Sequence, residues 1–284
     1  MVDGWWLFVG GWWLFVGGPR LIVVHCLRLI NSPAQLTLHL SLLDFVFLSF
    51  VFPLFIILYS LLSFFLLTFY FLLFTLMIKN LFIALEGIDG SGKSTQLTLL
   101  TKKLEAAGHK VYATFEPTNG PIGAMIRTIL KGDTHTDDRV IAGLFVADRL
   151  DHLLNKENGI VKKMEEGYTV ICDRYCFSSY AYQGTHMSMD WVIAANSMSA
   201  SILKPDVNVF IDVDPEVSME RITNNRETIE IYETLDNQKK VRAKFYEAFD
   251  LMKNKENIFI VDGNRAAEMV AYDIFTELSN TTFK

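Results

Sequence analysis

The first 78 residues contain almost no charge, which divides the chain into two parts of different composition. Only four of its 58 Lys, Arg, Asp and Glu residues lie there, namely Asp3, Arg20, Arg28 and Asp44. One uniform globular domain over all 284 residues is therefore excluded. From residue 79 onward, 24 basic and 30 acidic side chains occupy 206 residues, which is typical of a soluble domain with its own core.

Cysteine is scarce, and positive charge is outnumbered by negative charge. The three cysteines, Cys26, Cys172 and Cys176, form neither a C-x-x-C pair nor a zinc-binding spacing, so nothing requires an oxidising compartment or a structural metal. A net charge of -6 disfavours a partner that is bound mainly by neutralising a phosphate backbone. We therefore expect no nucleic-acid partner.

The uncharged N-terminal part supports two interpretations. Residues 45–78 are 34 uncharged residues rich in Phe and Leu, whereas a membrane-spanning helix needs only about 20. Residues 4–10 and 11–17 repeat the same seven letters, GWWLFVG, too few copies for a solenoid. Either residues 45–78 anchor the chain in a membrane, or residues 1–76 are translated non-coding sequence upstream of a misplaced start, with Met77 the true one.

Residues 77–284 alternate between short apolar runs and helical patterns. The predicted strands are residues 81–86, 110–115, 168–172, 207–213 and 257–261. The predicted helices are residues 93–107, 123–130, 137–154, 190–203, 215–224, 233–252 and 266–278. This alternation predicts an α/β domain with three layers around a five-stranded parallel sheet. Ligands of such sheets bind at the carboxyl ends of the strands.

The strongest chemical signal is a complete G-x-x-x-x-G-K-[ST] phosphate loop between the first predicted strand and helix. Its backbone N–H groups can surround phosphates, Lys93 can reach the β and γ groups, and the Ser94 hydroxyl can bind Mg²⁺. The strand and helix on either side make a chance match improbable. The predicted nucleotide-binding residues are Gly87, Ile88, Asp89, Gly90, Ser91, Gly92, Lys93, Ser94 and Thr95.

Two further groups gain meaning beside a phosphate loop. Asp173 and Arg174 end the third predicted strand, where a carboxylate can hold a metal-bound water and an arginine can grip a second phosphate. Phe145 and Arg149 are four residues apart on a predicted helix and share a face, which suits stacking on a nucleobase and bonding its carbonyl. The alternatives are a turn with an ion pair, and a core Phe under a surface Arg.

Four stretches of residues 77–284 resemble the thymidylate kinase family of P-loop kinases. They are EGIDGSGKSTQ (86–96), the pair Phe145 and Arg149, D-R-Y (173–175), and SSYAYQG (178–184). The resemblance implies an enzyme that transfers a phosphoryl group from ATP to dTMP to give dTDP, with Mg²⁺ as the metal. It also implies a homodimer and a cytoplasmic catalytic domain, with membrane attachment only if residues 45–78 are translated. Residues 1–76 have no counterpart in the family, which favours the misplaced start.

The resemblance also implies roles for residues that would hold dTMP. Phe145 would stack on thymine, and Arg149 would bond its O4. Ser179 would approach the edge of the base, and Tyr182 would crowd the 2′ position of the sugar. Asp89 would bond the 3′-hydroxyl and lie near the metal.

Arg174 would hold the acceptor phosphate in the same comparison. Glu116 and Arg127 match positions near the acceptor, and Gln183 lies beside the pocket, although capping, surface charge and loop solvation are equally good explanations of these three. The predicted metal ligands are Ser94, Asp89 and Asp173. The predicted catalytic residues are Lys93, Asp173, Arg174 and Arg226.

The sequence departs from the family pattern at two places. Phe115 stands where the family often has Arg before Glu-Pro, and Gly90 stands where some members carry an Arg in the phosphate loop. The charge that neutralises the transferring group would then come from the lid, predicted at about residues 222–232. Arg226 is the better candidate there and Arg221 the second.

Other functions remain to be weighed against a dTMP kinase. Another P-loop nucleotide or nucleoside kinase would share the fold but not the pair Phe145 and Arg149. A GTP-binding switch would need N-K-x-D, whereas both N-K-E-N tetrapeptides, at 155–158 and 254–257, end in Asn. A binding module without catalysis is disfavoured by the intact Lys93.

Overall fold

The computed structural model describes residues 5–9, 12–17, 20–25, 52–77, 80–225 and 234–282. The chain divides into two units, Met1–Phe74 and Thr75–Lys284, which are described separately. The phosphate loop lies in the second unit, directly after its first strand.

The N-terminal unit contains a small antiparallel sheet and a helix. The two copies of the repeat form β1 (Trp5–Val9) and β2 (Trp12–Gly17), which pair with each other, and β3 (Arg20–His25) pairs with β2. These strands differ from the expectation for residues 1–76, although Trp, Phe and Val favour strands. Helix α2 (Phe52–Met77) comes next in the chain.

The predicted membrane segment falls partly on residues 45–51 and 78, which lie outside the described residues. Side chains of α2 are described for residues 56–69. Across the described parts of the chain, no helix has both the length and the apolar character needed to cross a membrane.

The second unit is built on a five-stranded parallel sheet, as predicted. The strand order is β5-β6-β4-β7-β8, and every neighbouring pair is parallel. The strands are β4 (Phe82–Glu86), β5 (Lys110–Phe115), β6 (Tyr168–Asp173), β7 (Val207–Asp212) and β8 (Ile258–Asp262). The bounds agree with the predicted ones to within one residue at each end. The phosphate loop therefore follows the central strand of the sheet.

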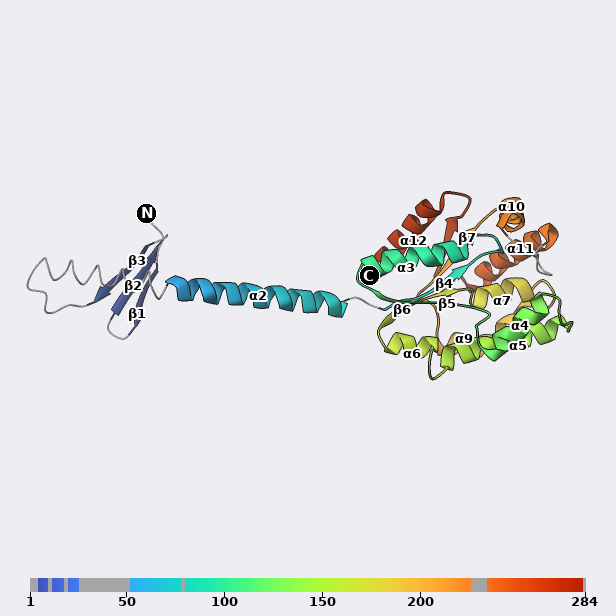
Figure 1. Cartoon of the computed structure of the whole chain (residues 1–284), viewed down its shortest axis with the longest axis horizontal. Coiled ribbons are helices and arrows are strands. Elements are labelled where there is room, and N and C mark those ends of the chain that lie inside the picture. Colours follow the sequence, from blue (N-terminus) through green and yellow to red (C-terminus); the bar gives the residue numbers. More distant parts are fainter. Residues whose placement is uncertain are drawn as a thin grey trace, which may run out of the picture. The chain divides into compact units, whose positions relative to one another are not determined.

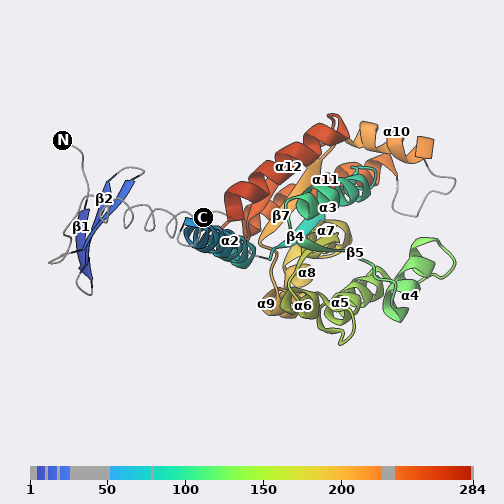
Figure 2. The ribbon, with the colours of Figure 1, turned by 60° about the vertical axis from the view of Figure 1, so that its left-hand side comes forward.

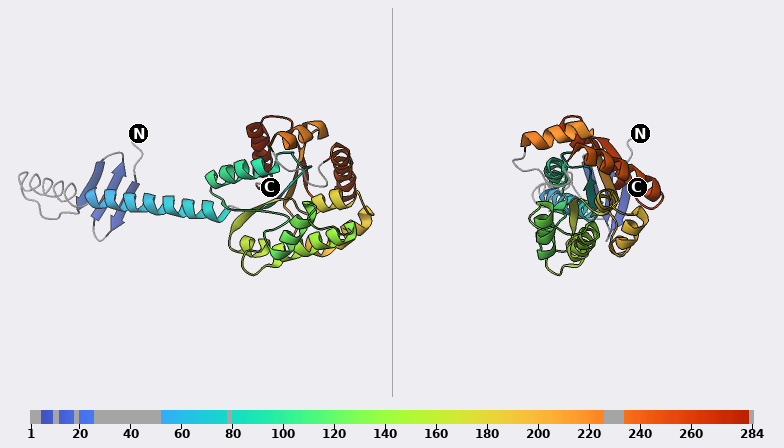
Figure 3. Two further views of the ribbon diagram at one scale, coloured as in Figure 1. Left: turned by 45° about the vertical axis from the view of Figure 1, so that its right-hand side comes forward. Right: turned by 90° about the vertical axis from the view of Figure 1, so that its right-hand side faces the viewer.

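Helices cover both faces of this sheet, because its central strands are apolar on both sides. Along β4, Ile83 and Leu85 pack with α3 (Lys93–Ala106) and α12 (Ala267–Thr282). Phe82 and Ala84 face the other cluster, to which four further helices, among others, contribute. These are α5 (Asp138–Leu154), α6 (Ile160–Glu165), α7 (Cys176–Gln183) and α11 (Leu235–Met252). Figures 1 and 3 show α3 and α12 on one side of the strands and α5 and α6 on the other, which confirms the three layers.

Two predictions about helices need correction. The helix predicted over residues 190–203 is interrupted at Asn196, whose φ of −91° and ψ of 0° separate α8 (Met189–Ala195) from α9 (Ser197–Ile202). Helices α6 and α7 were not predicted, because α6 is short and nearly every residue of α7 is buried, which removes the amphipathic pattern.

Two helices lie at the end of the sheet where the phosphate loop begins. They are α4 (Pro121–Leu130), which starts with its proline at a first-turn position, and α10 (Pro215–Asn225). In Figure 2, α10 and α4 lie on opposite sides of the strands at that end. Both are therefore placed to contribute to a site at the carboxyl ends of the strands.

The aromatic cluster under α11 gives a test of the core. Phe245 is fully buried, and its ring lies 4.8 Å from that of Phe210 and 5.9 Å from that of Phe249. We expect Phe245→Ala to lower the free energy of unfolding by about 3–5 kcal/mol, because it leaves a cavity among rings that cannot collapse. Tyr272→Ala, on the exposed side of α12, is the control and should change it by less than about 0.5 kcal/mol. Equal losses in urea unfolding would contradict the packing.

Candidate active site

A cleft of about 650 Å³ opens at the carboxyl ends of the strands. Most of the residues that the sequence predicted as functional line it, which brings the donor and acceptor groups into one space. These are Asp89, Gly90, Gly92, Lys93, Ser94, Thr95, Glu116, Arg127, Phe145, Arg149, Asp173, Arg174, Ser179, Tyr182 and Gln183. The predicted loop residues Gly87, Ile88 and Ser91 are not among the lining residues. Arg226 lies outside the described residues.

The phosphate loop has the backbone that its glycines predict. Gly90 and Gly92 have φ of +73° and +97°, a region that side chains rarely adopt. The buried Lys93 Nζ donates to the carbonyls of Gly87, at 3.0 Å, and Ile88, at 2.8 Å. These carbonyls occupy donors that could otherwise serve nucleotide phosphates.

Burial sets the charge on Lys93. Burial, with the positive charge of Arg174 in the same direction, lowers the pKa of Lys93 to about 8, although Asp173 and Asp89 oppose the shift. The ammonium is therefore close to losing its proton slightly above neutral pH. An anion bound in the loop would favour the charged form.

Ser94 and Asp173 form a pair of oxygen ligands. The Ser94 hydroxyl donates to Asp173 Oδ2 at 3.0 Å, and Asp173 Oδ1 is buried without a hydrogen-bond partner. A hydroxyl beside a carboxylate with an unused oxygen is the donor set that Mg²⁺ prefers. The chemistry of these two residues therefore fits the predicted metal.

Asp89, the third predicted metal ligand, makes other contacts. Its Oδ1 pairs with Arg174 Nη2, and its Oδ2 accepts from the Tyr182 hydroxyl at 2.7 Å and from Gln238 Nε2 at 3.4 Å. Burial alone would raise the pKa of Asp89, but the charges of Arg174 and Lys93 hold it below its usual value. Both carboxylate oxygens already have protein donors in this structure.

Arg149 is fully buried and uses all five of its N–H donors. Nε and Nη2 donate to Glu116 Oε2 at 2.9 and 2.6 Å, and Nη2 also donates to the Tyr175 carbonyl at 2.9 Å. Nη1 donates to Ser179 Oγ at 3.0 Å and to Asn196 Oδ1. A guanidinium has no sixth donor. Arg149 can therefore bond a base carbonyl only if one of these bonds is shared or released.

Glu116 holds Arg149 from the end of β5. Its second oxygen lies 3.1 Å from His152 Nδ1, and Thr114 Oγ1 lies 2.7 Å from His152 Nε2. Burial raises the pKa of Glu116, but Arg149 and His152 outweigh it and lower the pKa. Ligand atoms of Glu116, His152 and Cys172 lie within 4.8 Å of one another, but Arg149 already supplies the cation that neutralises Glu116.

The loop after β5 is fixed by hydrogen bonds with Asp148 and Arg127. Asp148 accepts the backbone N–H of Thr118 at 2.7 Å and its hydroxyl at 2.6 Å. Arg127 Nη1 donates to the carbonyls of Pro117 and Thr118 at 2.9 and 2.5 Å. In this state Arg127 therefore stabilises the loop, while Phe115 is 41% exposed on the cleft.

Helix α10 packs against the phosphate loop. A Cβ at Gly90 would lie 2.6 Å from the Ser218 carbonyl, and the Ser218 hydroxyl donates to the Asp89 carbonyl. A residue with a side chain at position 90 does not fit without moving α10. Arg221, on the same helix, donates from Nη2 to the Gly263 carbonyl at 3.0 Å and lines the cleft.

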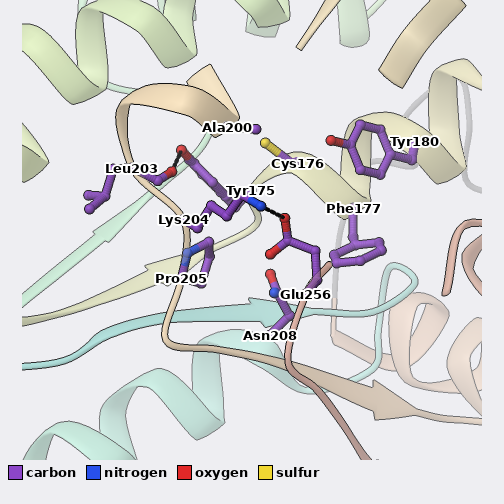
Figure 4. A pocket seen from close by; sticks show the side chains of 10 residues that line it. All are labelled: Tyr175, Cys176, Phe177, Tyr180, Ala200, Leu203, Lys204, Pro205, Asn208 and Glu256. Carbon is purple, nitrogen blue, oxygen red and sulfur yellow. Dashed lines mark hydrogen bonds and ion pairs between the residues drawn. The ribbon is translucent and has the colours of Figure 1, made fainter. Parts of the chain in front are cut away.

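A second, much smaller cavity lies beside Cys176. It measures about 10 Å³, close to the room that one water molecule needs, and is lined by Tyr175, Tyr180 and Glu256 among others (Figure 4). Burial raises the pKa of Cys176 to about 12, so its thiol stays protonated. This cavity is too small for a nucleotide, and the protonated thiol of Cys176 is a poor nucleophile.

Several buried polar residues at the site had no role predicted from the sequence. They are Glu86, Asp148, His152, Ser178, Asn196 and Gln238. Glu86 was detectable, because an acidic residue ends an otherwise apolar strand. Asn196 gave no signal, since it lies in a stretch that reads as a continuous helix.

The fold and the cleft define a P-loop kinase of small phosphorylated substrates. The phosphate loop follows the central strand, and the side chains of Arg149 and Arg174 line the same cleft. The thymidylate kinase family model matches residues 85–274.

Curated relatives agree with this match. A probable thymidylate kinase of Pyrobaculum aerophilum is 43% identical over 195 residues, which are 68% of this chain and 93% of the relative. One of Methanocaldococcus jannaschii is 37% identical over 72% of this chain and 98% of the relative. The thymidylate kinase of Caldicellulosiruptor saccharolyticus is 33% identical over 71% and 95%. The chain therefore belongs to the thymidylate kinase family and is an enzyme of the kinase class.

The lowered pKa of Lys93 predicts that nucleotide binding takes up a proton. Near pH 7 the ammonium is charged before and after binding, whereas at about pH 8.5 much of the free protein has a neutral Lys93 that bound phosphates would recharge. Calorimetry of ATP binding in two buffers of different ionisation enthalpy should therefore show more proton uptake at the higher pH. The same uptake at both pH values would contradict the shifted pKa.

Proposed function

We propose that this protein transfers the γ-phosphoryl group of ATP to dTMP and releases dTDP, as a step in dTTP synthesis. The observation that carries the proposal is that one cleft contains both the phosphate loop and the Phe145 and Arg149 pair. Family membership supports the same reaction. Phosphoryl transfer needs positioning and charge stabilisation more than covalent chemistry, so no covalent enzyme intermediate is expected.

The donor side is the phosphate loop. The backbone N–H groups of residues 87–95 bind the phosphates of ATP, and Lys93 exchanges its two carbonyl acceptors for phosphate oxygens. Ser94 and Asp173 would hold Mg²⁺, which neutralises charge on the phosphates when bound. Asp89 joins them only by giving up a bond to Arg174 or Tyr182.

The acceptor side recognises thymine and the sugar. Phe145 stacks on the base, and the Arg149 guanidinium bonds its O4 by sharing the donor that now serves Ser179. Tyr182 lies beside Asp89, where its ring occupies the space of a 2′-hydroxyl while Asp89 bonds the 3′-hydroxyl. Glu116 and Asn196 act behind Arg149, and Gln183 lines the same wall.

Arginines supply the positive charge that neutralises the transferring phosphoryl group. Arg174 holds the acceptor phosphate, and Arg226, with Arg221 as the second candidate, supplies the charge that Gly90 cannot. The lid is the segment of about residues 222–232. The position of α10 beside the phosphate loop supports Arg221, whereas Arg226 and residues 226–232 of the lid lie outside the described residues and their roles rest on the family resemblance.

The proposal also covers the domain organisation, the oligomeric state and the location of the protein. Residues 77–284 form the kinase domain, and residues 1–76 are an extension that the kinase site does not need. The active form is a homodimer. The catalytic domain is cytoplasmic, and membrane attachment requires that residues 45–78 are made.

The reaction is tested by supplying ATP with dTMP, dUMP, dCMP or a ribonucleoside monophosphate to the purified protein. We expect dTMP to give the highest kcat/KM. Lys93→Met, which keeps a buried chain of similar length, should lower kcat by about 10²–10³-fold without unfolding the protein. Preference for another monophosphate would contradict the proposal and favour the alternative, a P-loop kinase that acts on a different nucleotide or nucleoside.

The domain assignment is tested by a chain that begins at Met77. It should fold and keep full activity, because the strand, loop and helix of the phosphate site all begin after that residue. Fractionation of native cells then separates the two interpretations of the N-terminus. Activity in the soluble fraction from a protein that starts at Met77 would eliminate the anchor, and activity released from membranes only by detergent would eliminate the misplaced start.

A further inference from the structure

Arg174 has a backbone conformation that needs an explanation. Its φ is +74°, and among the described residues it is the only one other than glycine with a positive φ. Such a conformation costs a residue with a Cβ about 1 kcal/mol or more, so surrounding contacts must hold it. Its own N–H donates to the Leu85 carbonyl at 2.8 Å.

The next contacts come from Glu86, at the end of the central strand. Glu86 is fully buried, and its Oε1 accepts the backbone N–H of Tyr175 at 3.0 Å. Its Oε2 accepts the Ser178 hydroxyl at 2.5 Å. The carboxylate therefore binds the chain on the C-terminal side of Arg174, at Tyr175 and at Ser178 in the first turn of α7.

Ser178 connects Glu86 to the side chain of Arg174 by hydrogen bonds. Its Oγ accepts from Arg174 Nη1 at 3.2 Å, while its own proton is donated to Glu86. A carboxylate, a hydroxyl and a guanidinium thus form one chain, in which the hydroxyl donates to the carboxylate and accepts from the guanidinium. The other arm of the guanidinium, Nη2, pairs with Asp89.

A buried carboxylate in an apolar strand is expensive unless its hydrogen bonds are made. The neighbours of Glu86 along β4 are apolar and fully buried, so the core would accept an apolar residue there. Both of its oxygens are used on the segment that carries Arg174. This points to a role in placing that arginine.

We infer that Glu86 and Ser178 are positioning residues for the acceptor phosphate, which act by fixing the backbone and guanidinium of Arg174. The inference rests on the proposed function, because the phosphate is that of dTMP. A guanidinium held in place before the substrate arrives loses less conformational freedom on binding. Neither residue takes part in the transfer itself.

Two ligands that differ only in the phosphate test this role. Calorimetry without ATP gives the dissociation constants of thymidine and dTMP. The constant for thymidine divided by the constant for dTMP, the phosphate ratio, measures how much the phosphate adds to the affinity. In Ser178→Ala we expect this ratio to fall by about tenfold, the loss of one charge-assisted hydrogen bond, with thymidine binding unchanged. A loss that is equal for both ligands would mean general damage and overturn the inference.

Ser179→Ala is the matched control. Ser179 is the next residue of the same helix, but its hydroxyl accepts from Arg149, on the side of the base. This variant should change thymidine and dTMP binding by the same factor and leave their ratio as in the parent. A ratio that falls as much as in Ser178→Ala would overturn the separation of the two roles.

Glu86→Gln distinguishes an indirect role from a direct one. Glu86 is fully buried, so it can affect the phosphate only through Arg174 and Ser178. The ratio should fall in this variant as well, and the double variant with Ser178→Ala should lose less than the sum of the two. If both variants fold and Ser178→Ala lowers the ratio while Glu86→Gln does not, then Ser178 is a direct ligand of the phosphate and the inference is wrong.

The proposed function can fail separately. A parent protein that does not phosphorylate dTMP overturns the function, whatever the variants do. A parent that phosphorylates dTMP, with a Ser178→Ala variant that keeps the phosphate ratio, overturns only the positioning role. Thermal unfolding of each variant shows that its fold is intact.

Discussion

The ion pair between Arg174 and Asp89 is the contact on which the rest of the site depends. It joins the turn after β6 to the phosphate loop after β4, two segments that are neighbours in space and 85 residues apart in sequence. Neither charge can be buried alone without a large desolvation cost. The pair is only partly exposed, at 18% and 17% of the two side chains, so each group needs the other until a ligand replaces it. A bound phosphate and a sugar hydroxyl would be such replacements, and the site is therefore formed before its substrates arrive.

The same exchange of partners occurs elsewhere in the cleft. Lys93 donates to loop carbonyls, and every N–H of Arg149 has a protein acceptor. A ligand must therefore displace or share these acceptors. These hydrogen bonds avoid the desolvation cost of unpaired buried cations. Ligand binding is favourable only if the new contacts contribute more free energy than the protein hydrogen bonds that are broken. Selectivity results from this balance. A ligand that lacks the matching acceptor breaks these bonds and restores none of them.

The sequence predicted the parts of this protein that are set by local pattern. The five strands and the phosphate loop are expected from apolar runs and glycine spacing, and the structure confirms both. The break at Asn196 could not be predicted, because it exists to bring an amide to a buried arginine on another helix. The role of Glu86 was equally hidden, since only the three-dimensional structure shows that both of its oxygens meet the segment around Arg174. Family resemblance predicted residues that mostly line the cleft, and the supporting residues behind them are visible only in the contacts of the structure.

Helix α7 shows why fold and site cannot be separated here. With eight residues it is too short to be stable by its own propensity, and nearly all of it is buried. Three of its side chains are held by three different parts of the site: Ser178 by Glu86, Ser179 by Arg149, and Tyr182 by Asp89. Residues proposed to position or contact the phosphate, the base and the sugar thus also hold the helix in place. A change at any of the three must be judged on stability as well as on binding, because the contacts that position the helix also fix the proposed substrate-binding groups.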